Sequence, residues 1–95
     1  MPLTTVSVRL SNGINETLYY PSSVVKDYFE ENQRLHLLEF VELALESLLE
    51  SDKRVTAKFG FPCIGCMILK NRLSRWGEIY KDEIVEIIKI HEFTY

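Results

Sequence analysis

The side chains best suited to chemistry lie close together near the middle of the chain, where two cysteines follow a basic and aromatic segment. Cys63 and Cys66 stand three residues apart, and Pro62 favours the first turn of a helix because its missing N–H costs nothing there. A thiol at the start of a helix faces unpaired backbone N–H groups and the positive end of the helix dipole, which stabilise a thiolate. The spacing therefore points to a redox dithiol or to half of a zinc site.

Neither kind of site is complete in the sequence. A thioredoxin-like domain has the cysteine pair after an early strand and carries a later cis-proline, whereas here the pair follows a long predicted helix and no proline comes after it. For zinc, the other ligand candidates, His36 and His91, lack paired spacing. Because the cytosol keeps thiols reduced, we expect Cys63 and Cys66 to be free thiols buried as small apolar side chains, with redox sensing and metal binding as alternatives. We assign no metal and no cofactor.

The segment before the cysteines combines cations with aromatic rings, notably Arg54, Lys58, Phe59 and Phe61. Charge and stacking rings are the components of a single-stranded nucleic-acid site, but a net charge of −3 and the expected burial of these rings argue against that function. The four glycines are scattered, so no phosphate-binding loop is present in the sequence. No general base is identifiable beside Ser22-Ser23. We therefore expect no catalytic residues and no enzyme activity.

Charge is distributed unevenly along the chain. Residues 26–52 include eight acidic and two basic side chains, whereas residues 53–81 include seven basic side chains and one acidic one. Adjacent segments of opposite sign can attract each other within a domain, between two copies, or toward a charged partner. We expect this charge to be used within the domain, between two copies or in solvent, without an external ligand, and the exposed edge of a small sheet makes a homodimer plausible.

Length and composition fit a single domain covering residues 1–95. The chain is 46 % apolar and 26 % charged, which is the globular range and enough for one core. No stretch approaches the roughly 20 apolar residues that span a bilayer, and the N-terminus lacks the layout of a signal peptide. We expect a cytoplasmic protein without a membrane segment.

The first twenty residues have the pattern of a β-hairpin. Apolar and polar residues alternate over residues 6–10, and Asn12-Gly13 is a strong hairpin turn because both residues adopt positive φ readily. A two-residue loop would place Arg9 opposite Glu16. At the other end of the chain, residues 84–93 are rich in Ile and Val and predict a strand that pairs with this hairpin, the alternative being a fourth helix.

Three helices are predicted between the hairpin and the last strand. A short one covers residues 23–29, followed by a polar break over residues 30–34. The longest covers residues 37–58, with an apolar stripe in the core and a glutamate stripe in solvent, and ends at Gly60. The third covers residues 62–76, ends at Gly77, and is expected to bury Ile64, Met67, Ile68 and Leu73. The predicted fold class is α+β, a three-stranded antiparallel sheet with three helices packed on one face.

Two segments of the chain resemble a bacterial protein family. They are residues 20–29, with the sequence Y-P-S-S-V-V-K-D-Y-F, and residues 51–63, whose most specific part is R-V-x-A-K-F-G-F-x-C. They are similar to the small nitrogen-starvation-response proteins that bacteria encode in nitrilase gene clusters, and the resemblance covers nearly the whole chain. The family pattern has one cysteine after the glycine, so the resemblance singles out Cys63 rather than the Cys-x-x-Cys pair.

The resemblance implies a non-catalytic accessory or regulatory protein of the nitrogen-starvation response. Such a protein would act through contacts with an enzyme of nitrogen metabolism or one encoded in the same cluster. The alternative is a thiol-dependent redox or small-ligand protein that uses Cys63. The candidate interaction residues are those of the more specific motif: Arg54, Lys58, Phe59, Gly60, Phe61 and Cys63.

Overall fold

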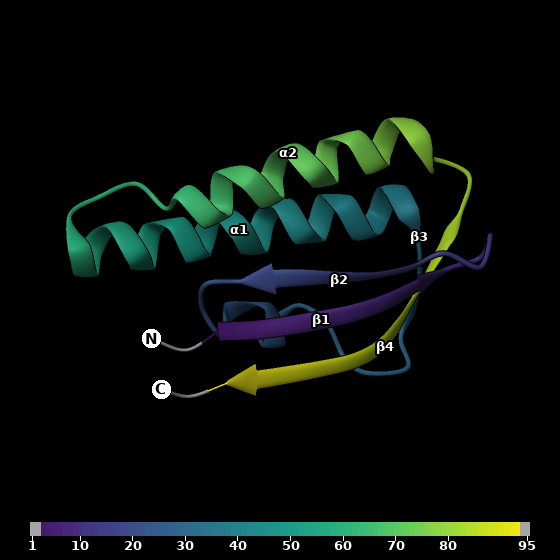
Figure 1. Ribbon diagram of the computed structural model, residues 1–95, viewed down its shortest axis with the longest axis horizontal. Helices are drawn as coiled ribbons and strands as arrows, with labels where there is room; N and C mark the ends of the chain where they lie inside the picture. Colours follow the sequence, from purple (N-terminus) through teal and green to yellow (C-terminus); the bar gives the residue numbers. More distant parts are fainter. Residues whose placement is uncertain (1–2, 94–95) are drawn as a thin grey trace.

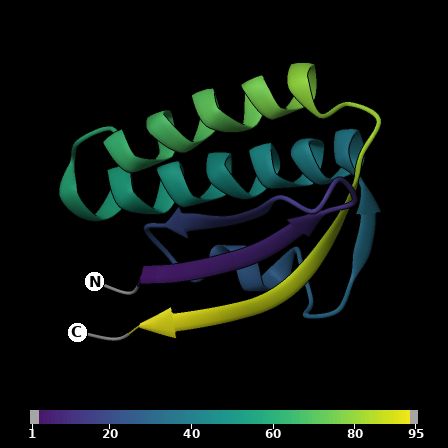
Figure 2. The same ribbon diagram turned by 45° about the vertical axis from the view of Figure 1, so that its right-hand side comes forward.

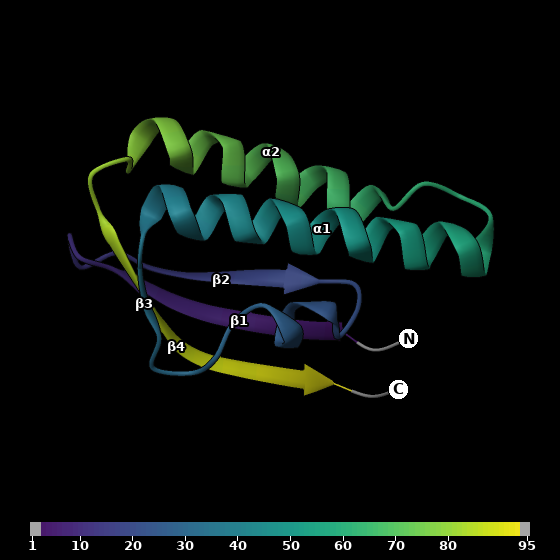
Figure 3. The same ribbon diagram turned by 180° about the vertical axis from the view of Figure 1, so that it is seen from behind.

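A four-stranded antiparallel sheet carries two long helices in the computed structural model, which describes residues 3–93 (Figure 1). The helices lie side by side along the sheet, as the opposite view also shows (Figure 3). In chain order the elements are β1 (Leu3–Leu10), β2 (Asn15–Tyr20), the 3₁₀ turn η1 (Val24–Asp27), β3 (Arg34–His36), α1 (Leu37–Phe59), α2 (Ile64–Ile79) and β4 (Ile84–Phe93).

The strands follow the order β2-β1-β4-β3, so the predicted three-stranded sheet is wrong and the sheet has four strands. The expected strand at the C-terminus is confirmed, since β4 pairs with β1 of the hairpin. The additional strand is β3, which lies against the start of β4 (Figure 2) and pairs Leu35 with Val85. This strand begins at Arg34, in a segment predicted as a polar break. It was missed because three residues are too few to show an alternating pattern of their own, and their pairing is imposed by β4.

The hairpin loop has three residues rather than two. The Leu10 amide donates to the Ile14 carbonyl at 2.8 Å, and Gly13 follows the turn with a φ of +93°, the left-handed conformation that closes such loops. The longer loop shifts the register, so Arg9 faces Asn15 and the predicted pair of Arg9 with Glu16 is wrong.

Two α-helices and one short 3₁₀ turn replace the three predicted helices. The longest prediction is confirmed by α1, which ends at Gly60 with a φ of +75°. The expected helix over residues 23–29 is only the four-residue turn η1, which buries Val24 and Val25 beneath α1. The glutamate stripe of α1 faces solvent, as its spacing predicted: Glu39, Glu42 and Glu46 are exposed and Glu50 is half-buried.

The buried face of α2 differs from the predicted one. The helix buries Cys66, Leu69, Leu73 and Trp76, and it continues through Gly77 to Ile79. Of the residues predicted to be buried, only Leu73 is; the side chains of Ile64, Met67 and Ile68 are 58 to 71 % exposed. The apolar residues of this helix occupy two faces, and packing against α1 and β2 selects the other one.

The core lies between the sheet and the helices. Alternate residues of β1, β2 and β4 point toward buried side chains of α1 and α2. Phe40 of α1 links the segment after η1 to α2, with its ring centroid 4.9 Å from that of Phe29 and 6.4 Å from that of Trp76. Within residues 3–93, no helix combines the length and the apolar character that crossing a bilayer requires.

Candidate functional site

The predicted interaction residues gather at the end of the molecule where α1 stops and α2 begins (Figure 1). Gly60 makes the stop possible, because its left-handed conformation lets its amide donate to the Thr56 carbonyl at 2.8 Å. Cys63 then occupies the N-cap position of α2. The motif that is continuous in sequence is therefore a helix end, a short loop and a helix start.

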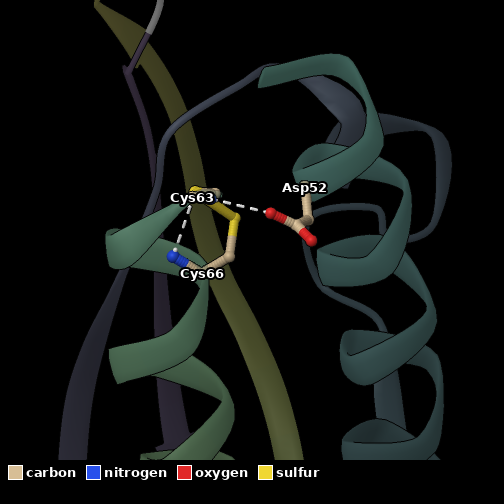
Figure 4. A group of neighbouring side chains, drawn as sticks. All are labelled: Asp52, Cys63 and Cys66. Atoms are coloured by element: carbon tan, nitrogen blue, oxygen red, sulfur yellow. Dashed lines mark hydrogen bonds between the residues drawn. A yellow bond between two sulfur atoms is a disulfide. The ribbon is translucent and has the colours of Figure 1, made fainter. Parts of the chain in front are cut away.

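A disulfide joins Cys63 to Cys66 at the first turn of α2 (Figure 4). Both residues are buried, as predicted, but the prediction of free thiols is wrong. The Cys66 amide donates to Cys63 Sγ at 3.1 Å, so the sulfur caps the helix. The Cys63 amide donates in turn to Asp52 Oδ1 at 2.8 Å, which fastens the start of α2 to α1.

The three side chains of this cluster are close enough to share one ion. The carboxylate of Asp52 and the sulfur atoms of Cys63 and Cys66 lie within 4.8 Å of one another. Thiolates, however, are the form of cysteine that binds metals, and here the two sulfur atoms are bonded to each other. In this oxidised state the cluster is a disulfide with a neighbouring carboxylate.

A separate hollow of about 150 Å³ lies between the turn after β2 and the last turns of α1. It is lined by Pro21, Ser22, Ser23, Arg54, Val55, Lys58 and Phe59. The Lys58 ammonium lies 5.5 Å from the centroid of the Phe59 ring, within the range of a cation–π contact. Arg54 forms an exposed ion pair with Glu50 at 3.6 Å, a contact of small energy that leaves its guanidinium available to other groups.

A buried hydrogen bond holds the two walls of this hollow together. Ser22 Oγ lies 2.8 Å from Ser51 Oγ, and both serines are buried. One turn earlier on α1, Ser47 donates to the hydroxyl of Tyr20 at 3.3 Å. Burial raises the pKa of Tyr20 to about 12, so this hydroxyl stays neutral over the physiological range.

The predicted site residues thus divide into four positions. Arg54, Lys58 and Phe59 line the hollow, Gly60 sets the end of α1, and Phe61 projects from the loop with 70 % of its surface exposed. Cys63 belongs to the disulfide cluster and not to the lining of the hollow.

A family model described as nitrogen starvation-induced protein NitG matches residues 5–93. The chain belongs to the NitG family. The resemblance to nitrogen-starvation-response proteins is thereby confirmed, whereas the gene neighbourhood stays a prediction. No curated protein and no solved structure gave a significant match.

The fold brings together the two segments on which the resemblance to the NitG family was based. Pro21, Ser22 and Ser23 come from the first segment, and Arg54, Val55, Lys58 and Phe59 come from the second; all line the same hollow. The hydrogen bond between Ser22 and Ser51 also joins these segments. Sequence motifs some 30 residues apart therefore form one surface feature in this member of the NitG family.

Three residues of these sites were missed in the sequence. Asp52 was counted only among the eight acidic side chains of residues 26–52, and Ser22 was considered as a nucleophile without a general base. Ser51 lies within the helix, where a single serine carries no signal of a tertiary partner. A weak signal did exist, because Ser47 and Ser51 stand one turn apart on the helix face that packs against η1 and the preceding turn.

Proposed function

We propose that this protein is a non-catalytic accessory or regulatory protein of the nitrogen-starvation response, located in the cytoplasm. It acts by binding a protein partner, either an enzyme of nitrogen metabolism or one encoded beside it. The observation that carries the proposal is the hollow between the Pro21–Ser23 turn and α1, with Arg54 and Lys58 in its lining. Family membership supplies the physiological setting.

The charge at the hollow indicates the chemistry of the partner. Arg54 and Lys58 are both exposed, and the cap hydrogen bond at the end of α1 comes from the Gly60 amide to the Thr56 carbonyl, not from either cation. Complementary charge chiefly speeds association and selects among partners. An acidic patch on the partner enzyme would meet these two side chains.

Exposed apolar side chains in the loop after α1 and in the first turn of α2 would add contact area. A specific interface usually buries about 800 Å² on each side, more than a hollow of this size supplies. Phe61 and Ile64 continue the surface into the loop and the first turn of α2, and they are 70 and 71 % exposed. Aromatic and apolar side chains at the centre of an interface, with charge at its rim, are the usual arrangement of residues that dominate binding.

Affinity capture from nitrogen-starved cells tests the proposal. The bait is the full chain, compared with an Arg54→Glu/Lys58→Glu variant and with a control, Lys81→Glu/Lys89→Glu, that makes the same change in net charge at two other exposed positions. We expect the first variant to lose about tenfold or more in affinity for an enzyme that the native chain and the control retain, because like charges then face each other.

Two outcomes would contradict the proposal. One is capture of no enzyme of nitrogen metabolism or of the gene neighbourhood, and the other is equal binding by both charge-reversal variants. Sedimentation of the purified chain separates the remaining alternative, a homodimer, from binding to another protein.

A further inference from the structure

A second pocket lies beside Cys66 of the disulfide, between α1 and α2, and it shares no lining residue with the hollow described above. Its volume is about 290 Å³, and its walls are apolar, formed by Leu45, Leu48 and Leu49 of α1 and by Met67 of α2. Asp52, Cys66 and Lys70 complete the lining. The lining includes Cys66 and not Cys63, so the pocket borders the disulfide on the side of Cys66, and both cysteines are buried.

The other sulfur is placed to carry negative charge. Cys63 Sγ accepts a hydrogen bond from the Cys66 amide at 3.1 Å and stands at the N-terminus of α2, a helix of 16 residues. An amide donor and the positive end of a helix dipole both stabilise a thiolate over a thiol. In thiol–disulfide exchange, a sulfur that is stabilised as a thiolate is the better leaving group.

We propose that Cys63 and Cys66 form a thiol–disulfide exchange site whose substrate is a protein dithiol. The incoming thiolate attacks Cys66 Sγ from the pocket and forms a mixed disulfide, while the bond between Cys63 and Cys66 breaks and its electron pair remains on Cys63 Sγ. The second thiolate of the partner then attacks its own sulfur in the mixed disulfide and releases Cys66. The partner dithiol is oxidised to a disulfide, this chain is reduced by two electrons, and the two thiol protons end on Cys63 and Cys66.

The surroundings favour a protein dithiol over a small thiol. The leucines and Met67 offer an apolar wall for the side chain next to the attacking cysteine, a contact that glutathione, with its charged groups, does not provide. Asp52 supplies a carboxylate within 4.8 Å of both sulfur atoms, near enough to pass a proton through a small shift or a water molecule. The lining of the hollow contains neither cysteine.

Trapping the mixed disulfide on the oxidised, full-length chain tests the proposal without altering either cysteine. The probe is a thioredoxin whose resolving cysteine is replaced by serine, so that the first adduct persists, and peptide mass spectrometry locates it. We expect the adduct on Cys66. An adduct on Cys63, or no adduct together with no reduction by intact thioredoxin, would overturn the proposal.

Kinetics with matched variants test the pocket and the class of reductant. Met67→Glu places a charge in the wall, whereas Ile68→Glu places it one residue further on, at an exposed position outside this pocket. We expect intact thioredoxin to reduce Met67→Glu at least about fivefold more slowly than Ile68→Glu, and glutathione to be at least about tenfold slower than thioredoxin at equal thiol concentration. Equal rates for the two variants would overturn the pocket as the route of attack, and equal rates for the two reductants would overturn the protein dithiol as substrate.

Discussion

Removing the hydroxyl of Ser51 is expected to weaken the attachment of the Pro21–Ser23 turn to α1. Ser51 is fully buried, and its Oγ lies 2.8 Å from Ser22 Oγ. Ser51→Ala deletes this bond and leaves Ser22 Oγ with a single long contact, 3.4 Å from the Val24 amide. A neutral hydrogen bond contributes about 0.5–1.5 kcal/mol and a stranded buried partner costs about 1–3 kcal/mol, so we expect a loss of about 1.5 kcal/mol. For a domain of this size that lowers Tm by roughly 6 to 12 °C.

Urea unfolding gives a direct measurement of this loss. Trp76 is the single tryptophan of the chain and is buried, so its fluorescence reports the unfolding transition. In the Ser22→Ala/Ser51→Ala double variant neither hydroxyl is stranded, and we expect a coupling free energy of about 1 kcal/mol between the two sites. Ser74→Ala, at an exposed position of α2, serves as the control. If the losses of the two single variants sum to the loss of the double variant within about 0.3 kcal/mol, the argument that the two hydroxyls bind each other is refuted.

Three further predictions concern stability. Thr4 is fully buried and its Oγ1 has no hydrogen-bond partner among the described residues, so Thr4→Val should raise the free energy of unfolding by about 1 kcal/mol in urea. Tyr20 has a pKa of about 12 in the folded chain and 10.0 in the unfolded chain. Its contribution to the free energy of unfolding, on the order of 2 to 3 kcal/mol, is therefore present below pH 10 and is lost as the pH rises toward 12. Tyr20→Phe should abolish that decline in the free energy of unfolding. Gly60→Ala meets no atom within 4 Å but forces a side chain into a φ of +75°, so we expect a loss of about 1 kcal/mol in thermal unfolding, and no loss would contradict the cap.

Elements with a strong period or a strong stop signal were predictable from the sequence. The alternation before Asn12-Gly13 indicated the hairpin, and the stop at Gly60 placed the end of α1 within a residue. The detail of the hairpin was not predictable, because two- and three-residue loops share the same Asn-Gly signal and only backbone closure between Leu10 and Ile14 distinguishes them.

Features set by tertiary contacts were not predictable. Both Ile68 and Leu69 are apolar, and packing against α1 and β2 rather than local pattern decides that Leu69 is buried. β3 exists because β4 provides its hydrogen bonds.

The candidate sites show the same division. The motif indicated Arg54, Lys58 and Phe59 as one group, and they do line one hollow. Its opposite wall comes from Pro21–Ser23, about 30 residues away, a juxtaposition that no local spacing reveals. At the cysteines the spacing was compatible with a disulfide, and the expectation of a reducing compartment led to the prediction of free thiols, which the structure corrects.

Site-specific photo-crosslinking in nitrogen-starved cells tests most directly the claim that this end of the molecule binds a protein partner. A photoreactive phenylalanine replaces Phe61, which is 70 % exposed in the loop between α1 and α2, or Tyr19, which is 59 % exposed on β2, as the matched aromatic control. We predict one adduct of defined mass at position 61, none of that mass at position 19, and loss of the adduct in the Arg54→Glu/Lys58→Glu background. Absence of an adduct at position 61, or the same adduct at both positions, would contradict the account.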